Sequence, residues 1–267
     1  MAVAPEPAPA APERPRVASP LPLHEPLWTY VLLGINVLVW LAMTVAGGSE
    51  NLRVLIDFGA KFNPLIVLEQ EYWRLVTPMF LHIGFLHLAF NSYALFAFGL
   101  DVERLFGRTR FLALYVLAGI AGAVASFVGN EAVSAGASGA IFGLVGAMVV
   151  YLLIYRNAFG QWGRQRLTNL LLIVVLNLVI GVTGAGIDNL GHVGGLLGGM
   201  ALGWVYCPRY RLTPPETPWD PPRLQDAYPR WRAWAVSLAL LGLLAALTYV
   251  GILRWAALYG APGAQAF

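Results

Sequence analysis

The sequence predicts an all-α polytopic membrane protein, with a core of six transmembrane helices and one added C-terminal transmembrane helix. Hydrophobic residues make up 58% of the 267 positions and charged residues only 12%, against about 25% charged residues in soluble domains. The mean hydropathy of +0.65 agrees with this class. Seven charge-free windows are each long enough to cross about 30 Å of hydrocarbon as a helix. They cover residues 26–49, 75–100, 111–130, 132–155, 167–187, 189–208 and 233–253.

Four parts are expected along the chain. Residues 1–26 are rich in Pro and Ala and predict a disordered cytoplasmic tail, without the features of a cleavable signal peptide. Residues 27–208 hold the six-helix core. Within it, residues 50–74 mix apolar and charged side chains and predict a partly embedded interfacial loop. Residues 209–232 predict a Pro-rich cytoplasmic linker, which leads to the seventh helix and a short tail at 233–267.

The distribution of basic residues predicts the orientation. With the N-terminus in the cytoplasm, the inward-facing segments hold all but four of the 17 basic residues, in agreement with the positive-inside rule. Because these residues lie in short connections between helices, no nucleic-acid partner is expected. The four basic residues that lie outside the inward-facing segments are Arg53, Lys61, Arg74 and Arg254.

The chain has a single cysteine, Cys207. It therefore has neither an intramolecular disulfide nor a cysteine-based metal cluster.

This topology gathers the unusual polar residues on one side of the membrane. The second, fourth and sixth helices all start at the outer side. His82, His87 and Asn91 lie in the outer half of the second helix, whereas Ser138 starts the fourth and His192 starts the sixth. Ionisable residues inside a membrane are expensive and usually functional. We therefore expect one polar site near the outer face.

Ser138 and His192 are the two groups that a serine hydrolase needs. A serine hydroxyl becomes a good nucleophile when a base removes its proton, and a neutral imidazole is the usual base. Gly136 and Gly139 would let backbone N–H groups approach a developing oxyanion, and the helix N-terminus would add a favourable dipole. The structural alternative is that the serine and its glycines serve only helix packing.

Glycines at four-residue spacing predict close packing of the fourth and sixth helices. Small residues at this spacing form a smooth groove along one face of a membrane helix. Such packing would bring Ser138 and His192 within hydrogen-bond reach. The alternative for His192 is a structural hydrogen bond to a neighbouring helix. The matching small residues are Gly191, Gly195, Gly199 and Gly203 on the sixth helix and Gly139, Gly143 and Ala147 on the fourth.

His82, His87 and Asn91 form a second set of candidate residues. His87 and Asn91 are four positions apart and share a helical face. Imidazole and carboxamide side chains both carry N–H groups suited to an oxyanion. No metal is expected, because the chain has no His-Glu-x-x-His motif and no intramembrane carboxylate beside these histidines. Asp188 could orient the imidazole four residues later as the third member of a triad. We expect it instead to be a solvated or capping residue of the outer loop.

Four motifs match one protein family in order and spacing. They are Trp73-Arg74, the pattern His82-x4-His87-x3-Asn91, the tetrapeptide at 136–139 around Ser138, and His192 with the glycine repeat that follows it. On these motifs the chain resembles the rhomboid intramembrane serine proteases over about residues 28–207. The six-plus-one helix arrangement is also found in part of that family.

The resemblance implies a role for each matching residue. Ser138 would be the nucleophile and His192 its general base, in a dyad without an essential aspartate. His87, Asn91 and the Ser138 backbone N–H would form the oxyanion hole, with His82 and Gly136 in supporting positions. Trp73 and Arg74 would fix the first loop in the membrane plane. Phe142 stands where some relatives have a tyrosine that stacks on the histidine, and it keeps the ring.

The function expected from these features is that of an intramembrane serine endopeptidase. It would cleave transmembrane helices near the outer face, with single-span membrane proteins as substrates and the lipid bilayer as its surroundings, and without a cofactor. The expected location is a bacterial inner membrane. Two alternatives remain: a catalytically silent rhomboid-like binder of transmembrane segments, and a small-solute transporter or channel. A silent binder would not need the four polar residues Ser138, His192, His87 and Asn91 together. A transporter is not supported by any inverted repeat in the sequence.

Overall fold

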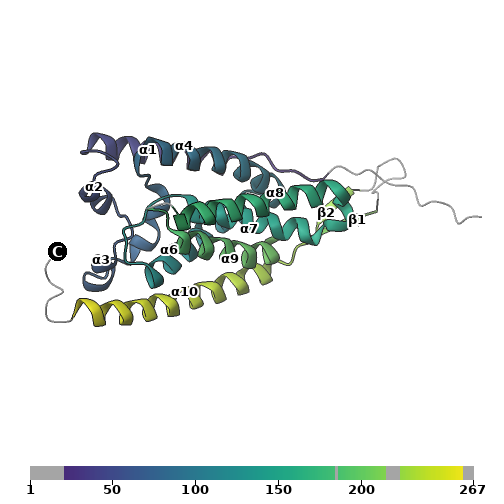
Figure 1. The fold of residues 1–267 in the computed structure, drawn as a ribbon. Helices are drawn as coiled ribbons and strands as arrows, with labels where there is room; N and C mark the ends of the chain where they lie inside the picture. The colour runs from purple at the N-terminus through teal and green to yellow at the C-terminus, as the bar shows by residue number, and fades with distance from the viewer. Residues whose placement is uncertain (1–20, 184–185, 215–222, 261–267) are drawn as a thin grey trace, which may run out of the picture.

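The computed structural model describes residues 21–183, 186–214 and 223–260. Long helices form a bundle in which α1 and α4 lie along one side, α10 along the opposite side, and α7, α8 and α9 between them (Figure 1). Residues 1–20 of the expected tail at 1–26 lie outside the described residues, and so do residues 261–267. The helical elements of the bundle are α1 (Trp28–Val45), α4 (Gly84–Ala94), η3 (a π-helix, Leu95–Gly99), α5 (Leu100–Phe106), α6 (Arg108–Gly129), α7 (Ser138–Ile154), α8 (Arg156–Thr183), α9 (Asn189–Tyr206) and α10 (Arg230–Tyr259).

Within the described residues, five helical segments are long and apolar enough to cross a membrane, namely Trp28–Val45, Gly84–Phe106, Arg108–Gly129, Arg156–Val182 and Trp231–Tyr259. The second of these joins α4, η3 and α5 into one helix. The apolar helix α7 is shorter, with 17 residues, and the glycine-rich α9 has 18. Each of the seven predicted windows thus overlaps one helix of the bundle. The prediction of an all-α polytopic membrane protein is confirmed.

Several helix boundaries differ from the predicted windows. The second window starts at residue 75, but its first part forms the short turns η1 (Tyr72–Leu75) and η2 (Thr77–Phe80), and the helix begins at Gly84. Pro78 in η2 lacks the N–H that a helix interior requires. Gly84 has a φ of +74°, which separates these turns from the helix. The helix α8 starts before its window and has a kink at Gly160, whose backbone angles are not helical. It includes the charged Arg166, which forms an ion pair with Asp101.

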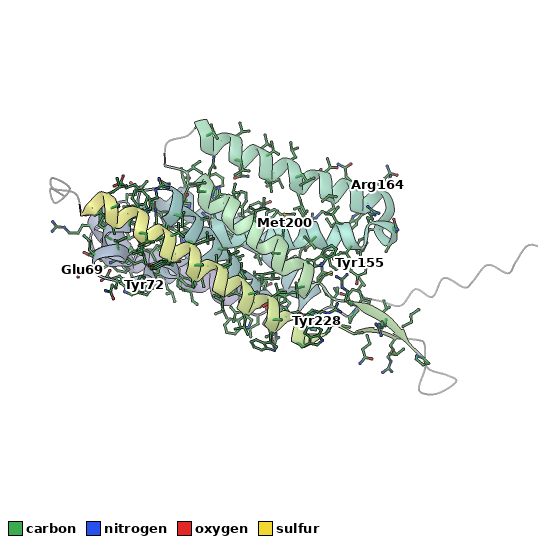
Figure 2. The ribbon with its side chains drawn as sticks, turned by 90° about the horizontal axis from the view of Figure 1, so that it is seen from below. Glu69, Tyr72, Tyr155, Arg164, Met200 and Tyr228 are labelled. Carbon is green, nitrogen blue, oxygen red and sulfur yellow. The ribbon has the colours of Figure 1, made fainter. Side chains whose placement is uncertain are left out.

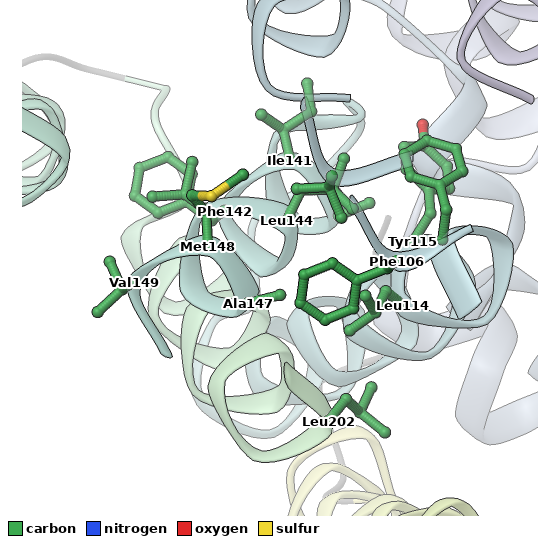
Figure 3. Packing of buried hydrophobic residues seen from close by; sticks show 14 of the residues in the cluster. Phe106, Leu114, Tyr115, Ile141, Phe142, Leu144, Ala147, Met148, Val149 and Leu202 are labelled. Carbon is green, nitrogen blue, oxygen red and sulfur yellow. The ribbon is translucent and has the colours of Figure 1, made fainter. Parts of the chain in front are cut away.

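The helix α7 is the centre of the bundle. Its residues from Ala140 to Leu152 are all buried, and a helix that is apolar all round must be surrounded by other elements. Figure 3 shows Phe106 of α5, Leu114 of α6 and Leu202 of α9 in the same apolar cluster as the residues of α7. A central, rigid α7 therefore fixes the position of its first residue, Ser138.

The glycines of α9 bring that helix into backbone contact with α7. A Cβ atom added at Gly195 would lie 2.0 Å from the carbonyl oxygen of Gly139, and one at Gly199 would lie 2.0 Å from that of Gly143. Real Cβ contacts are never this short, so only glycine fits. The predicted close packing of these two helices is confirmed. On its other face α9 approaches α6, where a Cβ at Gly194 would lie 2.4 Å from the Cβ of Ala125.

One end of the bundle carries the short helices α2 (Leu52–Asp57) and α3 (Asn63–Leu68) in the segment predicted as an interfacial loop. Lys61, between them, forms an isolated antiparallel bridge with Ser134 of the α6–α7 loop. Figure 2 places Glu69 and Tyr72 at this end.

The other end carries a two-stranded antiparallel sheet, β1 (Tyr210–Thr213) and β2 (Arg223–Asp226). The segment predicted as an extended linker thus has its two arms paired, and its residues 215–222 lie outside the described residues. Asp226 accepts a hydrogen bond from the N–H of Arg209 and forms an ion pair with Arg110 of α6. Arg164 and Tyr228 lie at this end (Figure 2).

The C-terminal helix α10 is attached at both ends. Near its start, the hydroxyls of Ser237 and Tyr206 of α9 are hydrogen-bonded at 2.5 Å. Near its end, the indole N–H of Trp255 donates to the carbonyl oxygen of Phe127 of α6 at 2.6 Å. The seventh helix therefore packs against the core on the face away from α1 and α4 (Figure 1).

Candidate active site

The side chains of Ser138 and His192 meet at the ends of α7 and α9. Ser138 is the first residue of α7, and His192 lies in the first turn of α9. The Oγ of Ser138 and the Nε2 of His192 are 2.9 Å apart, a hydrogen-bond distance. This contact depends on the glycines of α9. They allow the backbones of α7 and α9 to touch, and this close approach brings the two side chains within reach of each other.

The imidazole of His192 is held by a stacked ring. Phe142, one turn after Ser138, lies parallel to it with ring centroids 4.4 Å apart and an interplanar angle of 5°. The Nδ1 atom of His192 is buried and makes no hydrogen bond with any described residue. Packing against Phe142 and the contact with Ser138 therefore orient the ring.

Asp188 lies near His192 but does not hold its ring. The Asp188 carboxylate accepts hydrogen bonds from the Oγ of Ser134 at 2.7 Å and from the N–H of Gly191 at 3.0 Å. The second bond caps the N-terminus of α9. This agrees with the expectation of a capping residue, and the Asp188 side chain is partly buried. Burial raises the pKa of this carboxyl, but the hydrogen bonds and the nearby Lys61 charge outweigh burial and lower the pKa below 3.8.

His87 presents an N–H group beside Ser138. Its Nδ1 accepts a hydrogen bond from the backbone N–H of Ile83 at 3.2 Å, which assigns the proton of the neutral ring to Nε2. A Cβ added at Gly136 would lie 2.8 Å from that Nε2 and 3.6 Å from the Oγ of Ser138. The absence of a side chain at Gly136 therefore keeps open the space between the His87 donor and the serine.

Asn91 and His82 flank His87. The Nδ2 of Asn91 donates to the carbonyl oxygen of His87 at 2.9 Å, which uses one of its two hydrogens. His82 was expected inside the second helix, but it precedes Gly84, where that helix begins. Its buried ring lies edge-on to that of His87, with centroids 5.4 Å apart. His82 therefore supports the ring of His87 from outside the helix.

A cavity of about 750 Å³ connects these groups. Its walls come from α4, η3, α6, α7, α8, α9 and the loops at the same end of the bundle. Apolar residues such as Phe90 of α4 and Ile173 of α8 contribute to the lining. Irregular backbone and polar groups at membrane depth are tolerated where they line such a cavity. Among the candidate residues, Ser138, His192, His87, Asn91 and Gly136 line it.

Lys61 is a residue of the cavity wall that the sequence argument missed. It is fully buried, and its Nζ donates to the carbonyl oxygen of Asn130 at 2.7 Å. Burial lowers the pKa of Lys61 to about 8, against the opposing effects of Asp188 and Glu131. A signal existed, because Lys61 is the sole lysine in the chain. Within the described part of the chain, no three His, Cys, Asp or Glu side chains lie close enough to hold a metal ion.

Comparison with known proteins assigns the chain to a class of integral multi-pass membrane proteins. The Rhomboid domain family model matches residues 69–209. The chain belongs to the rhomboid family.

Three relatives show the extent of the likeness. The chain is 47% identical over 175 residues to Rhomboid protease GluP of Bacillus subtilis, which covers 66% of the chain and 34% of GluP. It is 35% identical over 182 residues to Putative rhomboid protease YdcA of the same organism, covering 67% of the chain and 88% of YdcA. Rhomboid-like protease 1 of Toxoplasma gondii is 33% identical over 234 residues, covering 81% of the chain and 72% of that protein. The chain thus spans about a third of the length of GluP.

Proposed function

We propose that this protein is an intramembrane serine endopeptidase that uses Ser138 as nucleophile and His192 as general base. The observation that carries this proposal is the 2.9 Å contact between Oγ and Nε2 at the wall of a cavity. A nucleophile and a base within hydrogen-bond reach are the signature of covalent catalysis. The names of GluP and YdcA support the same activity.

The reaction proceeds in two proton-balanced stages. In the first, the Oγ of Ser138 attacks the carbonyl carbon of the scissile peptide while its proton passes to the Nε2 of His192. The C–N bond then breaks, the imidazolium gives its proton to the leaving amine, and an acyl-enzyme remains. In the second, water attacks the acyl carbon and gives a proton to His192, which returns it to Ser138 as the carboxylic acid product leaves.

The negative charge on the tetrahedral intermediate needs donors already in place. The Nε2–H of His87 lies beside the space next to Ser138, and the carboxamide of Asn91 lines the same cavity. The backbone N–H of Ser138 belongs to the first turn of α7, where unpaired N–H groups and the helix dipole favour an anion. Preorganised donors of this kind supply several kcal/mol of transition-state stabilisation.

Transmembrane helices of single-span membrane proteins are the proposed substrates. A peptide bond inside a helix is shielded by its own hydrogen bonds, so the substrate must unwind locally to reach Ser138. The basic residues at the β-hairpin end support a cytoplasmic location for that end and for the N-terminus. The site then faces the outer side. The likeness to a bacterial protein supports a bacterial inner membrane as the location.

Covalent labelling with a fluorophosphonate tests the proposal. The wild-type protein should be labelled at Ser138, and Ser138→Ala should not be labelled. Ser237→Ala is a control, because the Ser237 hydroxyl is also hydrogen-bonded but is buried far away in α10. Its labelling should equal that of the wild type. Folded wild-type protein that resists a probe able to label another rhomboid protease would favour a catalytically silent binder and contradict the proposal.

A further inference from the structure

A hydrogen bond outside the Ser138–His192 pair joins the two segments that carry it. Ser134 lies in the loop that leads into α7, and its Oγ donates to the Oδ2 of Asp188 at 2.7 Å. Asp188 directly precedes α9, and its Oδ1 accepts the N–H of Gly191 at 3.0 Å. One carboxylate thus connects the loop before the serine to the first turn of the helix that holds the histidine.

The same loop is fixed from its other side by Lys61. The backbone N–H of Lys61 donates to the carbonyl oxygen of Ser134 at 2.9 Å, and the N–H of Ser134 donates back at 3.1 Å. The Nζ of Lys61 binds the carbonyl oxygen of Asn130, where the loop begins. Nearer to α7, the N–H of Gly136 donates to the carbonyl oxygen of Pro78 at 2.8 Å. With these contacts in place, the Ser134–Asp188 bond sets where the loop sits against α9.

We propose that Ser134 and Asp188 are positioning residues, whose mutual hydrogen bond fixes the separation of Ser138 and His192 through the backbone. This inference rests on the proposed protease function. Asp188 acts on the helix N-terminus and the loop, because its two oxygens are bonded there and the Nδ1 of His192 has no partner among the described residues. Ser134 and Asp188 line the same cavity as Ser138 and His192. A shift of either positioning residue therefore moves the backbone that holds the catalytic pair.

Substitutions at Asp188 separate this role from that of a triad aspartate. An asparagine there can still accept the N–H of Gly191 with its Oδ1 and donate from its Nδ2 to the Oγ of Ser134. Asp188→Asn should therefore keep the loop in place, whereas Asp188→Ala cannot. A triad aspartate behaves differently, because asparagine would favour the wrong tautomer of the histidine and be as harmful as alanine.

The test measures kcat and KM for cleavage of a single-span reporter protein in liposomes. Ser134→Ala and Asp188→Ala should each lower kcat by about 10-fold to 100-fold, since small displacements of reacting groups cost this much, and should change KM by less than about twofold. The double variant Ser134→Ala/Asp188→Ala should be no worse than Asp188→Ala, because the two substitutions remove one shared bond. Asp188→Asn should lose less than about fivefold. Ser237→Ala, which also removes a serine hydroxyl hydrogen bond between two elements, should keep wild-type kcat.

Three results would overturn the inference. The first is a kcat for Ser134→Ala equal to that of Ser237→Ala. The second is a kcat for Asp188→Asn as low as that of Asp188→Ala. The third is a loss of kcat in the double variant equal to the product of the two single losses. A melting temperature for each variant separates misplacement from unfolding, and Ser134→Ala is the milder substitution should Asp188→Ala fail to fold. Full cleavage by Ser138→Ala would instead reject the proposed function itself.

Discussion

The ring of Phe142 stacks on the imidazole of His192, with centroids 4.4 Å apart and an interplanar angle of 5°. Phe142 lies on α7, one turn after Ser138, so the residue that orients the base belongs to the same rigid helix as the nucleophile. The stacking explains how the His192 ring keeps one orientation in the cavity although no carboxylate among the described residues is hydrogen-bonded to it.

Replacement of Phe142 should affect catalysis in proportion to the loss of the ring. Phe142→Tyr keeps the stacking surface and should retain most activity, whereas Phe142→Ala frees the imidazole and should lower kcat by about 10-fold to 100-fold. Steady-state cleavage of a reporter protein measures both. Equal activity of the alanine and tyrosine variants would show that stacking is not what orients His192.

Gly136→Ala should impair activity through His87. Gly136 has a φ of +138°, and an added Cβ would lie 2.7 Å from the His87 ring. Gly48→Ala is a matched control, because Gly48 also has a positive φ of +108° but has no atom within 4 Å of an added Cβ. Both variants carry a similar backbone strain of about 1–2 kcal/mol. Only Gly136→Ala should lower kcat, by about 100-fold; an equal effect at Gly48 would point to backbone strain alone.

Gly199→Ala should separate α7 from α9 and destabilise the bundle. Its Cβ would lie 2.0 Å from the carbonyl oxygen of Gly143, and overpacking of this kind typically costs 1–3 kcal/mol. Gly242→Ala in α10 is the control, since nothing lies within 4 Å of its added Cβ. Thermal unfolding should show a lower melting temperature and lost activity for Gly199→Ala alone. An unchanged melting temperature would contradict the backbone contact between these helices.

The glycine spacing was sufficient to predict the packing of α7 on α9, because each helix carries its four-residue repeat within its own sequence. The joint position of Ser138 and His192 followed from it. The start of the second helix could not be predicted from apolar character, because Pro78 and the positive φ of Gly84 place that start well inside a charge-free window. His82 was misplaced for this reason.

The contacts around Asp188 were beyond the reach of sequence patterns. Ser134, Asp188 and Lys61 come from three different loops, and no spacing along the chain relates them. Their juxtaposition depends on the packing of α6, α7 and α9, which sets where those loops end. Lys61 carried a weak signal as the sole lysine of a chain rich in arginine, but that signal did not indicate burial.

Lys61 should give stability a dependence on alkaline pH. Its pKa falls from 10.5 to about 8 on folding, because burial disfavours the charged form. Unfolding therefore takes up a proton between pH 8 and 10.5, and the folded state gains stability as pH rises through that window. The shift corresponds to about 3 kcal/mol.

Lys61→Met removes this titration. The stability of the wild type relative to Lys61→Met should rise between pH 8 and 10.5 and stay constant from pH 6 to 8. Unfolding in detergent at a series of pH values, followed by tryptophan fluorescence, measures the difference. A difference that falls as pH rises would contradict the burial of a charged lysine.

Catalysis by Ser138 and His192 is best tested by cleavage of a single-span reporter in liposomes with the wild type, Ser138→Ala and His192→Ala. The wild type should cut the reporter near the outer end of its transmembrane segment, and both variants should be slower by at least about 1,000-fold while remaining folded. Cleavage by Ser138→Ala at the wild-type rate would show that Ser138 is not the nucleophile.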